Sequence, residues 1–376
     1  MSKKEIKVMF KTLTPLWTGD AWGENKEIRP SSIMGSLRFW FEIICYFSSI
    51  TSYCNYDSGK LNDNLDERKF REKIFENGMD FKGIDKFLAE CKVSLPSRVF
   101  GCTGWEGWVR IKTIQVTTED ADYDFPIGKI KFEELKYKKQ YFNKKANKKK
   151  EEKEITPTWY FQKGFKGTFE IIFEVEEKIL ETIFFPLLKF IEKYGFLGGK
   201  WNIGYGRVKV ESVSDEKWDS NFADKNDDEI KFKFTDSNSI RLSELINEKN
   251  SFSTSTQAYN YLKFFLNTKS FYCSCEKNFR DNISDISNDI RVAKLNNNFS
   301  DFQNAIKELL KIKAKMRNCL RPDNSIKEKQ VWHNFRHILL GTTSGGLEGT
   351  KIIPWIYKEN EQLEGGFISI AGIINL

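Results

Sequence analysis

The segment Gly195-Phe-Leu-Gly-Gly-Lys-Trp-Asn-Ile-Gly-Tyr-Gly-Arg-Val208 organises the first half of this 376-residue chain. A helix-like pattern over 179–194 precedes it, and an alternating strand pattern over 205–210 follows it. Glycine permits positive φ angles and lets other chain segments come close. A glycine loop with exposed amides, close to Lys200 and Arg207, suits a phosphate–sugar chain. A tight helix-to-strand turn that binds nothing explains the same glycines, and this alternative stays open.

Composition narrows the class of protein. A chain of 376 residues favours two domains, and 40% hydrophobic residues with 15% aromatic residues suffice for a real core. The net charge of +7 permits a nucleic-acid partner without identifying one. No apolar run reaches the ~18 residues that span a bilayer, and no signal-peptide pattern follows Met1. We therefore expect a cytoplasmic protein with reduced thiols and no membrane contact.

The periodic patterns of residues 1–212 predict the order β-α-β-β-α-β. The predicted strands are Glu5–Leu13, Trp108–Val116, Thr168–Glu176 and Tyr205–Val210, and the predicted helices are Pro30–Tyr46 and Ile179–Tyr194, the second with a break at Pro186. This order is the ferredoxin-like (RRM-like) pattern, an antiparallel sheet with two helices on one face. A helical insertion is expected within 57–91 and a mobile, lysine-rich loop within 128–154. The predicted class is α+β.

Residues 229–376 are predicted to form a second, mixed α/β domain, interpreted as a degenerate ferredoxin-like fold, with its topology left open. The polar segment 213–228 is interpreted as the linker. Strands are predicted at 229–234, 352–357 and 366–374, and helices at 256–266, 297–317 and 330–340.

Three motifs carry a family resemblance. Thr14-Pro-Leu-Trp-Thr-Gly19 is followed by Glu27-Ile-Arg-Pro-Ser-Ser-Ile-Met-Gly-Ser-Leu-Arg-Phe-Trp40, then by Arg98-Val-Phe-Gly101, and last by the glycine segment. In this order they resemble the RAMP superfamily of CRISPR-associated proteins, and within it the first subunit of the Cmr (type III-B) effector complex. The resemblance covers roughly the first domain. Lys200 and Trp201 stand where many relatives carry arginines, and the second domain offers only Leu339-Leu-Gly341, a faint match to a later glycine turn.

The resemblance implies a ferredoxin-like fold and a place in an RNA-guided complex. The implied partners are a guide (CRISPR) RNA, its target RNA and neighbouring Cmr RAMP subunits, with no membrane. The implied role is that of a capping, RNA-contacting component near the 3′ end of the guide. Target cutting and nucleotide synthesis then belong to other subunits.

The residues suggest how RNA would be held. Amides and hydroxyls at the start of the helix at Pro30, beside Arg29, favour an anion, although a capped core helix that binds nothing has the same residues. Arg38 needs a phosphate or a buried carboxylate as its partner, and the sequence does not choose. Trp17 and Trp22 suit base stacking or packing. The lysines of 136–150 would add salt-sensitive affinity or form a solvated loop. The predicted RNA-binding residues are Trp17, Thr18, Gly19, Arg29, Ser31, Ser32, Gly35, Arg38, Arg98, Lys144, Lys145, Lys148, Lys149, Gly198, Gly199, Lys200, Trp201, Tyr205 and Arg207.

Histidine is the usual general base or acid in metal-free RNA cleavage, and the first domain has none. His333 and His337 could join Cys273 and Cys275 at a metal, but the Cys-x-Cys spacing is poor for structural zinc. We therefore predict no catalytic residue, no metal and no cofactor. An endoribonuclease that uses the two histidines, or an aspartate that no motif reveals, is one alternative, and a purely structural capping subunit is the other.

Overall fold

The computed structural model describes most of the first half of the chain and a smaller part of the second. The described residues are 2–19, 24–48, 50–51, 65–77, 80–117, 128–142, 150–235, 237–245, 292–299, 301–319, 340–341, 350, 352–359 and 362–368. In these ranges, no helix is long and apolar enough to cross a membrane.

A four-stranded antiparallel sheet with the strand order β2-β7-β1-β8 forms the centre of the first half. Its strands are β1 (Lys3–Thr12), β2 (Val109–Val116), β7 (Thr168–Glu176) and β8 (Val208–Val213). The alternation of β1 buries Ile6, Val8 and Phe10 completely, so the period-2 pattern predicted this strand correctly. The last strand begins three residues later than predicted. Gly204 and Gly206 have φ angles of 85° and 90°, which no strand residue adopts, and they form a turn before β8.

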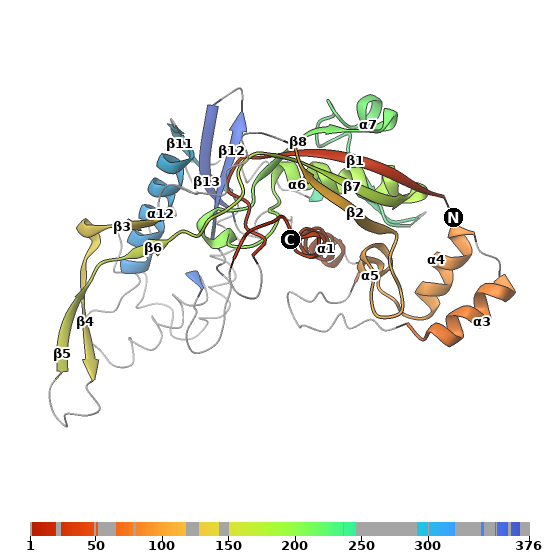
Figure 1. Cartoon of the computed structure of the whole chain (residues 1–376), viewed down its shortest axis with the longest axis horizontal. Helices are drawn as coiled ribbons and strands as arrows, with labels where there is room; N and C mark the ends of the chain where they lie inside the picture. Colours follow the sequence, from red (N-terminus) through yellow and green to blue (C-terminus); the bar gives the residue numbers. More distant parts are fainter. Residues whose placement is uncertain are drawn as a thin grey trace.

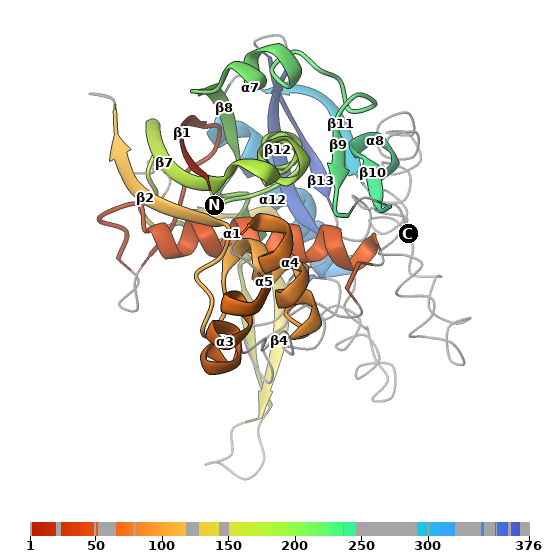
Figure 2. The same ribbon diagram turned by 90° about the vertical axis from the view of Figure 1, so that its right-hand side faces the viewer.

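Two helices, α1 (Pro30–Phe47) and α6 (Phe185–Lys193), pack against one face of this sheet (Figures 1 and 2). The order β1-α1-β2-β7-α6-β8 is therefore the predicted β-α-β-β-α-β order. The predicted helix over 179–194 is interrupted, because a π-helical turn at Leu180–Phe184 precedes α6. Pro186 stands in the first turn of α6, where its missing N–H costs no hydrogen bond.

The segments inserted between these elements have defined structure. The described residues before β2 form the short helices α3 (Glu67–Asn77), α4 (Phe81–Glu90) and α5 (Leu95–Phe100). Before β7, β3 (Lys129–Lys131) pairs with β6 (Thr158–Tyr160), and β4 (Tyr137–Phe142) pairs with β5 (Lys150–Ile155). The lysine-rich segment was predicted to be a mobile loop, but its described flanks form the antiparallel arms β4 and β5, which extend away from the sheet (Figure 1).

The C-terminal part is mixed helix and strand. It contains α7 (Glu216–Asn221), β9 (Lys231–Lys233), β10 (Ser239–Arg241), α8 (Leu242–Leu245), β11 (Val292–Phe299), α12 (Phe302–Cys319), β12 (Ile353–Glu359) and β13 (Gln362–Ile368). The last three strands form a sheet in the order β11-β13-β12. The expected linker includes α7, whose buried Trp218 packs on Phe185 at 5.5 Å between ring centres. The helix predicted at 256–266 lies outside the described residues, and so does the helix predicted at 330–340 except for its last residue, Leu340.

The glycine segment lies where two hydrophobic clusters meet. The larger cluster fills the space between the four-stranded sheet, α1 and α6, and it includes Phe196 and Leu197. The smaller cluster joins Ile203 and Tyr205 to the buried side of α12. Residues 195–208 therefore connect the two cores within a few residues, and this position decides which of their side chains reach the surface.

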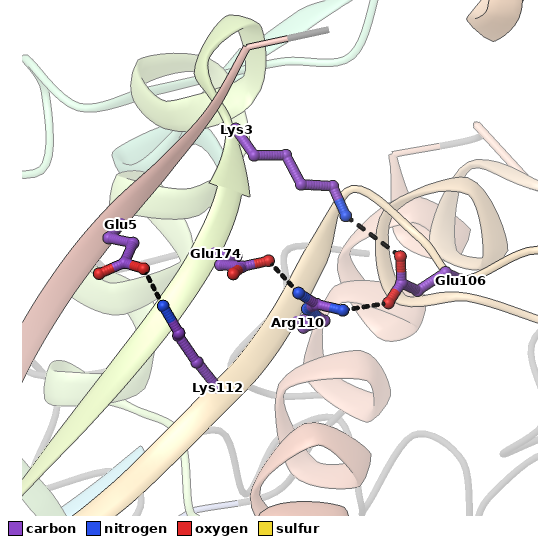
Figure 3. Close-up of polar contacts among 6 residues, drawn as sticks. All are labelled: Lys3, Glu5, Glu106, Arg110, Lys112 and Glu174. Atoms are coloured by element: carbon purple, nitrogen blue, oxygen red, sulfur yellow. Dashed lines mark hydrogen bonds and ion pairs between the residues drawn. The ribbon is translucent and has the colours of Figure 1, made fainter.

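The other face of the four-stranded sheet carries charged side chains from three strands (Figure 3). Lys3 lies 3.3 Å from Glu106, Glu106 lies 2.7 Å from Arg110, Arg110 also pairs with Glu174, and Lys112 pairs with Glu5. The aromatic side chains of the four strands, Phe10, Phe169 and Phe173, are all buried on the helix side. This open face therefore offers crossing ion pairs and no aromatic ring.

Candidate nucleic-acid interface

A groove of about 530 Å3 runs between α1 and the glycine segment. One wall is a single side of α1, since Ser32, Gly35, Ser36 and Phe39 recur at helical spacing. The other wall is residues 198–202, and Trp17 lies between the two. Thr350 and Ile353 complete the lining from the C-terminal part. The start of the helix and the glycine loop thus lie side by side.

Gly198 of this groove is required by the packing. Gly198 has a φ of 72°, and a Cβ built there would lie 2.4 Å from the carbonyl oxygen of Trp17. Its amide donates to Ser36 Oγ at 2.9 Å, and the amide of Gly199 donates to the Trp17 carbonyl at 2.8 Å. These bonds join the glycine loop to α1 and to the loop after β1, so they set the width of the groove.

The expectation of exposed glycine amides was wrong. Besides the two bonds just described, the amide of Gly204 donates to the carbonyl of Trp201 and that of Gly206 to the carbonyl of Pro15, at 2.8 and 2.9 Å. Buried backbone donors are expensive to leave unpaired, and the closely packed turn satisfies them internally. A ligand in the groove would therefore meet side chains and glycine Cα atoms.

Among the described residues that line this groove, Lys200 is the only cation. Its backbone is left-handed, with a φ of 63°, and Lys92 is the only other described residue besides glycine with a positive φ. Its Nζ lies 4.7 Å from the ring centre of Trp17, a cation–π distance. Partial burial lowers the pKa of the Lys200 ammonium. A left-handed lysine costs about 1–2 kcal/mol relative to the right-handed region, so its place in the groove is maintained against a local penalty.

Trp17 and Trp201 are packed aromatic residues. Trp201 stacks on Trp40, with ring centres 5.4 Å apart and planes 20° apart, and it contacts Phe39 edge-on at 5.2 Å. A Cβ on Gly19 would lie 2.2 Å from the Trp17 ring, so this ring covers the loop. Both tryptophans form part of the groove wall and part of the local core.

The hydroxyl groups of Thr18 and Ser32 hold the start of α1 in place. Thr18 is buried, and its Oγ1 accepts from the amide of Arg29 at 3.1 Å. Ser32 Oγ donates to the carbonyl of Thr18 at 3.1 Å. Ser31 is exposed, and Arg29 lies 3.8 Å from Glu27. Of these residues, Ser32 alone lines the groove.

Arg38 and Arg98 lie elsewhere. Arg38 donates to Glu42 at 2.7 Å, to Ser97 Oγ at 2.8 Å and to the Gly101 carbonyl. The structure thus answers the question about its partner in favour of a buried carboxylate, and Arg38 connects α1 to α5. Arg98 donates to Asp85 at 2.6 Å and connects α5 to α4.

Arg207 is fully buried, with 0% of its surface exposed. Its guanidinium donates to five backbone carbonyls, those of Ile191, Glu192, Lys193, Gly195 and Ile356. The first three are at the C-terminal end of α6, where carbonyls lack helical partners and the helix dipole favours a cation. Burial lowers the pKa of Arg207 to about 9. Because this pKa is still above neutral pH, the guanidinium stays protonated there. This side chain has no surface for a ligand.

Tyr205 is also fully buried, and its hydroxyl donates to the carbonyl of Gln162 at 2.9 Å. Burial raises the pKa of this phenol. The structure therefore brings together Trp17, Ser32, Gly35, Gly198, Gly199, Lys200 and Trp201 at the groove, and it leaves Arg38, Arg98, Tyr205 and Arg207 away from it.

Several predicted residues lie outside the described part of the chain. They are Lys144, Lys145, Lys148 and Lys149, the histidines His333 and His337, the cysteines Cys273 and Cys275, and Trp22. Within the described ranges, no group of three His, Cys, Asp or Glu side chains is placed to hold a metal ion.

Sequence reasoning missed five lining residues: Ser36, Phe39, Asn202, Thr350 and Ile353. A signal for two of them was present, since Ser32, Ser36 and Phe39 recur at i, i+4 and i+7 on one helix face. Asn202 follows the predicted Lys200–Trp201 pair directly. No pattern in the neighbouring sequence indicates Thr350 and Ile353. They reach the groove because the chain folds back onto residues 198–202, about 150 positions earlier in the sequence.

The sequence profile of the RAMP superfamily matches residues 9–209, more than half of the chain. This range begins in β1 and ends in β8, so it contains both α1 and the glycine segment. No curated protein sequence matches this chain significantly.

Three solved structures give the scale of the structural likeness. The apo form of Cmr1 from Pyrococcus furiosus has 12% identity and a TM-score of 0.36, and the alignment covers 99% of this chain and 94% of that one. Cmr6 from Pyrococcus furiosus has 17% identity and a TM-score of 0.29, over 56% of this chain and 98% of that one. A chain of the type III-B Cmr-beta complex bound to cognate target RNA has 16% identity and a TM-score of 0.27, over 56% and 60%. Structural similarity at these TM-scores supports no conclusion about the details of the fold or the function of this chain.

Proposed function

Because this chain belongs to the RAMP superfamily, we propose that it is a non-catalytic RNA-binding subunit of a type III-B CRISPR (Cmr) effector complex. In this proposal it contacts guide RNA, target RNA or both near the 3′ end of the guide, beside other Cmr RAMP subunits. The family match and the motif order at Thr14–Gly19, Glu27–Trp40 and Arg98–Gly101 support it. The groove between α1 and the glycine segment is the proposed RNA site.

The observation that carries the RNA site is the conformation of Lys200. A left-handed position favours glycine, and the neighbouring residues Gly198, Gly204 and Gly206 show that this segment uses glycine where only the backbone matters. Glycine would fit this position without strain, whereas the lysine adds an ammonium at a local cost. Its ammonium lies at the groove, over Trp17. A phosphate oxygen is the ligand that a partly buried ammonium without a carboxylate in its groove would favour.

The groove is a better RNA site than the open face of the sheet. Ordinary RRM proteins stack bases on aromatic residues of that face. Here the corresponding strands present Glu5 and Glu174, already paired with Lys112 and Arg110, and their aromatic residues are buried (Figure 3). Carboxylates repel phosphates, and a face without rings offers no stacking. The groove offers a cation, two tryptophans and the bare surface of Gly35.

We also infer that residues 1–212 form a ferredoxin-like domain, supported by the strand order β2-β7-β1-β8 and by the two helices on one face. The sequence analysis predicted that a second α/β domain covers residues 229–376. Ile230, Phe232 and Leu242 belong to the larger hydrophobic cluster. We therefore propose that the boundary lies after residue 245, so that β9, β10 and α8 belong to the first domain.

An RNA-binding assay tests the proposed function. Fluorescence anisotropy with a labelled single-stranded RNA, over a salt series with and without Mg2+, measures affinity and cleavage together. Lys200→Ala is the test variant and Lys92→Ala the matched control, because both remove one charge from a left-handed lysine and Lys92 is exposed on a different part of the surface. We expect binding that weakens with salt, a loss of about tenfold for Lys200→Ala alone, and intact RNA.

Each alternative has its own outcome in this assay. Cleavage that disappears in His333→Ala or His337→Ala would replace the proposal with a RAMP endoribonuclease. Equal affinity of the wild type and Lys200→Ala would remove the groove from the RNA path. Absence of RNA binding, both alone and within the reconstituted complex, would favour a purely structural capping subunit.

A further inference from the structure

A second hollow, of about 660 Å3, adjoins the groove at Lys200. Lys200 and Asn202 line both this hollow and the groove. Its other walls are β6 with the residues before it, and the side of α12 that carries Ala314 and Arg317. The two depressions therefore share one residue pair, and a chain that crosses Lys200 would enter both.

Tyr160 stands out in this hollow because its side chain is 72% exposed. Among the described large apolar side chains, Val116 is the only other exposed one, at 43%. Tyr160 is the last residue of β6 and pairs with Lys129 of β3. The adjacent Trp159 packs edge-on against Phe132 at 5.7 Å and anchors the strand. This strand thus presents an aromatic ring to solvent, where a partner could stack on it.

The charge of the hollow is positive. Among the described residues that line it, two are cations, Lys200 and Arg317, and none is a carboxylate. The guanidinium of Arg317 is oriented by its donation to the carbonyls of Leu340 and Gly341, at 3.0 and 3.2 Å. One turn earlier on α12, the buried Lys313 donates to the carbonyl of Asn202 at 3.0 Å, so α12 is fastened to the turn that follows Lys200.

We propose that this hollow is a second nucleotide subsite, in which one base of the RNA strand bound at Lys200 stacks on Tyr160 and Arg317 contacts the adjoining phosphate. The inference rests on the proposed function and extends it. Exposed aromatic rings beside cations are the general means of binding single-stranded RNA without reading its sequence. A ring on a strand is pre-organised for stacking, because little side-chain freedom remains to be lost on binding.

The order of the two subsites follows from their shared wall. The backbone of the strand passes Lys200, the groove takes the nucleotides on one side, and the hollow takes those on the other. The subsite at Tyr160 should therefore accept any base, and it should contribute only to RNAs long enough to extend past Lys200.

The test uses the full-length chain and single-stranded RNAs that carry 2-aminopurine at one position at a time. Stacking on Tyr160 quenches the fluorescence of one position in the wild type. Tyr160→Ala should abolish that quenching and weaken binding about tenfold, since one base–aromatic stack is lost. Tyr160→Phe should keep both the quenching and the affinity. Val116→Ala, which shortens the other exposed apolar side chain, is the matched control and should change neither.

A second arm removes the base. An RNA with an abasic nucleotide at the quenched position should bind the wild type about tenfold more weakly. It should bind Tyr160→Ala and the wild type equally well, because the two changes delete the same contact. Thermal unfolding of each variant confirms that the exposed substitution leaves the fold intact.

The outcomes separate this inference from the proposed function. If wild type and Tyr160→Ala bind equally well while Lys200→Ala is impaired, the second subsite is overturned and the RNA-binding function stands. If Tyr160→Phe loses as much as Tyr160→Ala, the hydroxyl rather than the ring makes the contact, and stacking is wrong. If the wild type binds no RNA under any condition, both proposals fail together.

Discussion

The glycine segment has an outer half, Gly198–Trp201, and an inner half, Gly204–Arg207, with a cation in each. Lys200 lies at the groove with its ammonium over Trp17. Arg207, seven residues later, is completely buried and bound to five carbonyls. One half presents a surface and the other holds the two cores together. The comparison shows that one glycine- and cation-rich motif places one of its cations at a surface groove and buries the other in the core.

We expect Arg207→Met to cause the largest loss in the free energy of unfolding. Five carbonyls would lose their donor, three of them at the end of α6, so the free energy of unfolding should fall by about 4 kcal/mol or more. Urea denaturation followed by circular dichroism measures the change. Arg207→Lys keeps the charge but lacks the forked donor geometry, and it should recover only part of the loss. A stable Arg207→Met protein with impaired RNA binding would contradict the division between the two halves.

Gly206→Ala should be the next most harmful change. A Cβ there would lie 2.1 Å from the carbonyl oxygen of Leu197, at a φ of 90°. We expect a loss of about 2–4 kcal/mol in the free energy of unfolding. Gly35→Ala is the control, because nothing lies within 4 Å of a Cβ at that helical position, and it should stabilise α1 by up to about 1 kcal/mol. Equal stabilities of the two variants would show that the inner turn tolerates side chains.

Lys313 contacts the glycine segment between its outer and inner halves, since its side chain donates to the carbonyl of Asn202. Burial lowers the pKa of Lys313 from 10.5 to about 7, helped by the nearby charge of Arg317. Between these values the unfolded state binds more protons, so stability should rise with pH from about 7 to 10.5 and should be lowest below pH 7. Lys313→Met should flatten this slope and stabilise the protein at pH 6 by about 1–3 kcal/mol, despite the lost hydrogen bond. An unchanged slope in urea titrations would refute this.

Lys200→Gly and Lys92→Gly form a matched pair at the two left-handed lysines. Lys92→Gly should raise the free energy of unfolding by about 1 kcal/mol, because glycine adopts this conformation without strain. Lys200→Gly should gain less, since the contact with Trp17 is lost. The RNA affinity should fall for Lys200→Gly alone, and the slope of log affinity against log salt should decrease by about 0.7. Equal RNA affinities of the pair would end the proposed role of Lys200.

Arg110→Ala, on the open face of the sheet, should have the smallest effect. It removes the exposed pairs with Glu106 and Glu174 (Figure 3), and such pairs contribute about 0–1 kcal/mol. The RNA affinity should stay within about twofold of the wild type, because a single distant charge is largely screened at physiological salt. A loss as large as that of Lys200→Ala would move the RNA from the groove to this face.

The sequence by itself determined the elements whose side chains alternate between water and core. β1, β2, β7 and α1 were predicted within a few residues, because burial on one face imposes a period of 2 or 3.6 on any chain. Pro186 also indicated that the second helix is not uniform, and it stands in the first turn of α6, directly after the π-helical turn. The family motifs identified the first half of the chain.

The tertiary structure alone decided which cations and amides face a ligand. Arg207 and Lys200 look equivalent in the sequence, but Arg207 lies under the end of α6 and against the carbonyl of Ile356, about 150 residues away. The glycine amides found partners in Ser36, Trp17 and Pro15, and the lysine-rich segment formed strand arms. The environment of a charge or an amide depends on contacts between segments far apart in the chain, and no local pattern records those contacts.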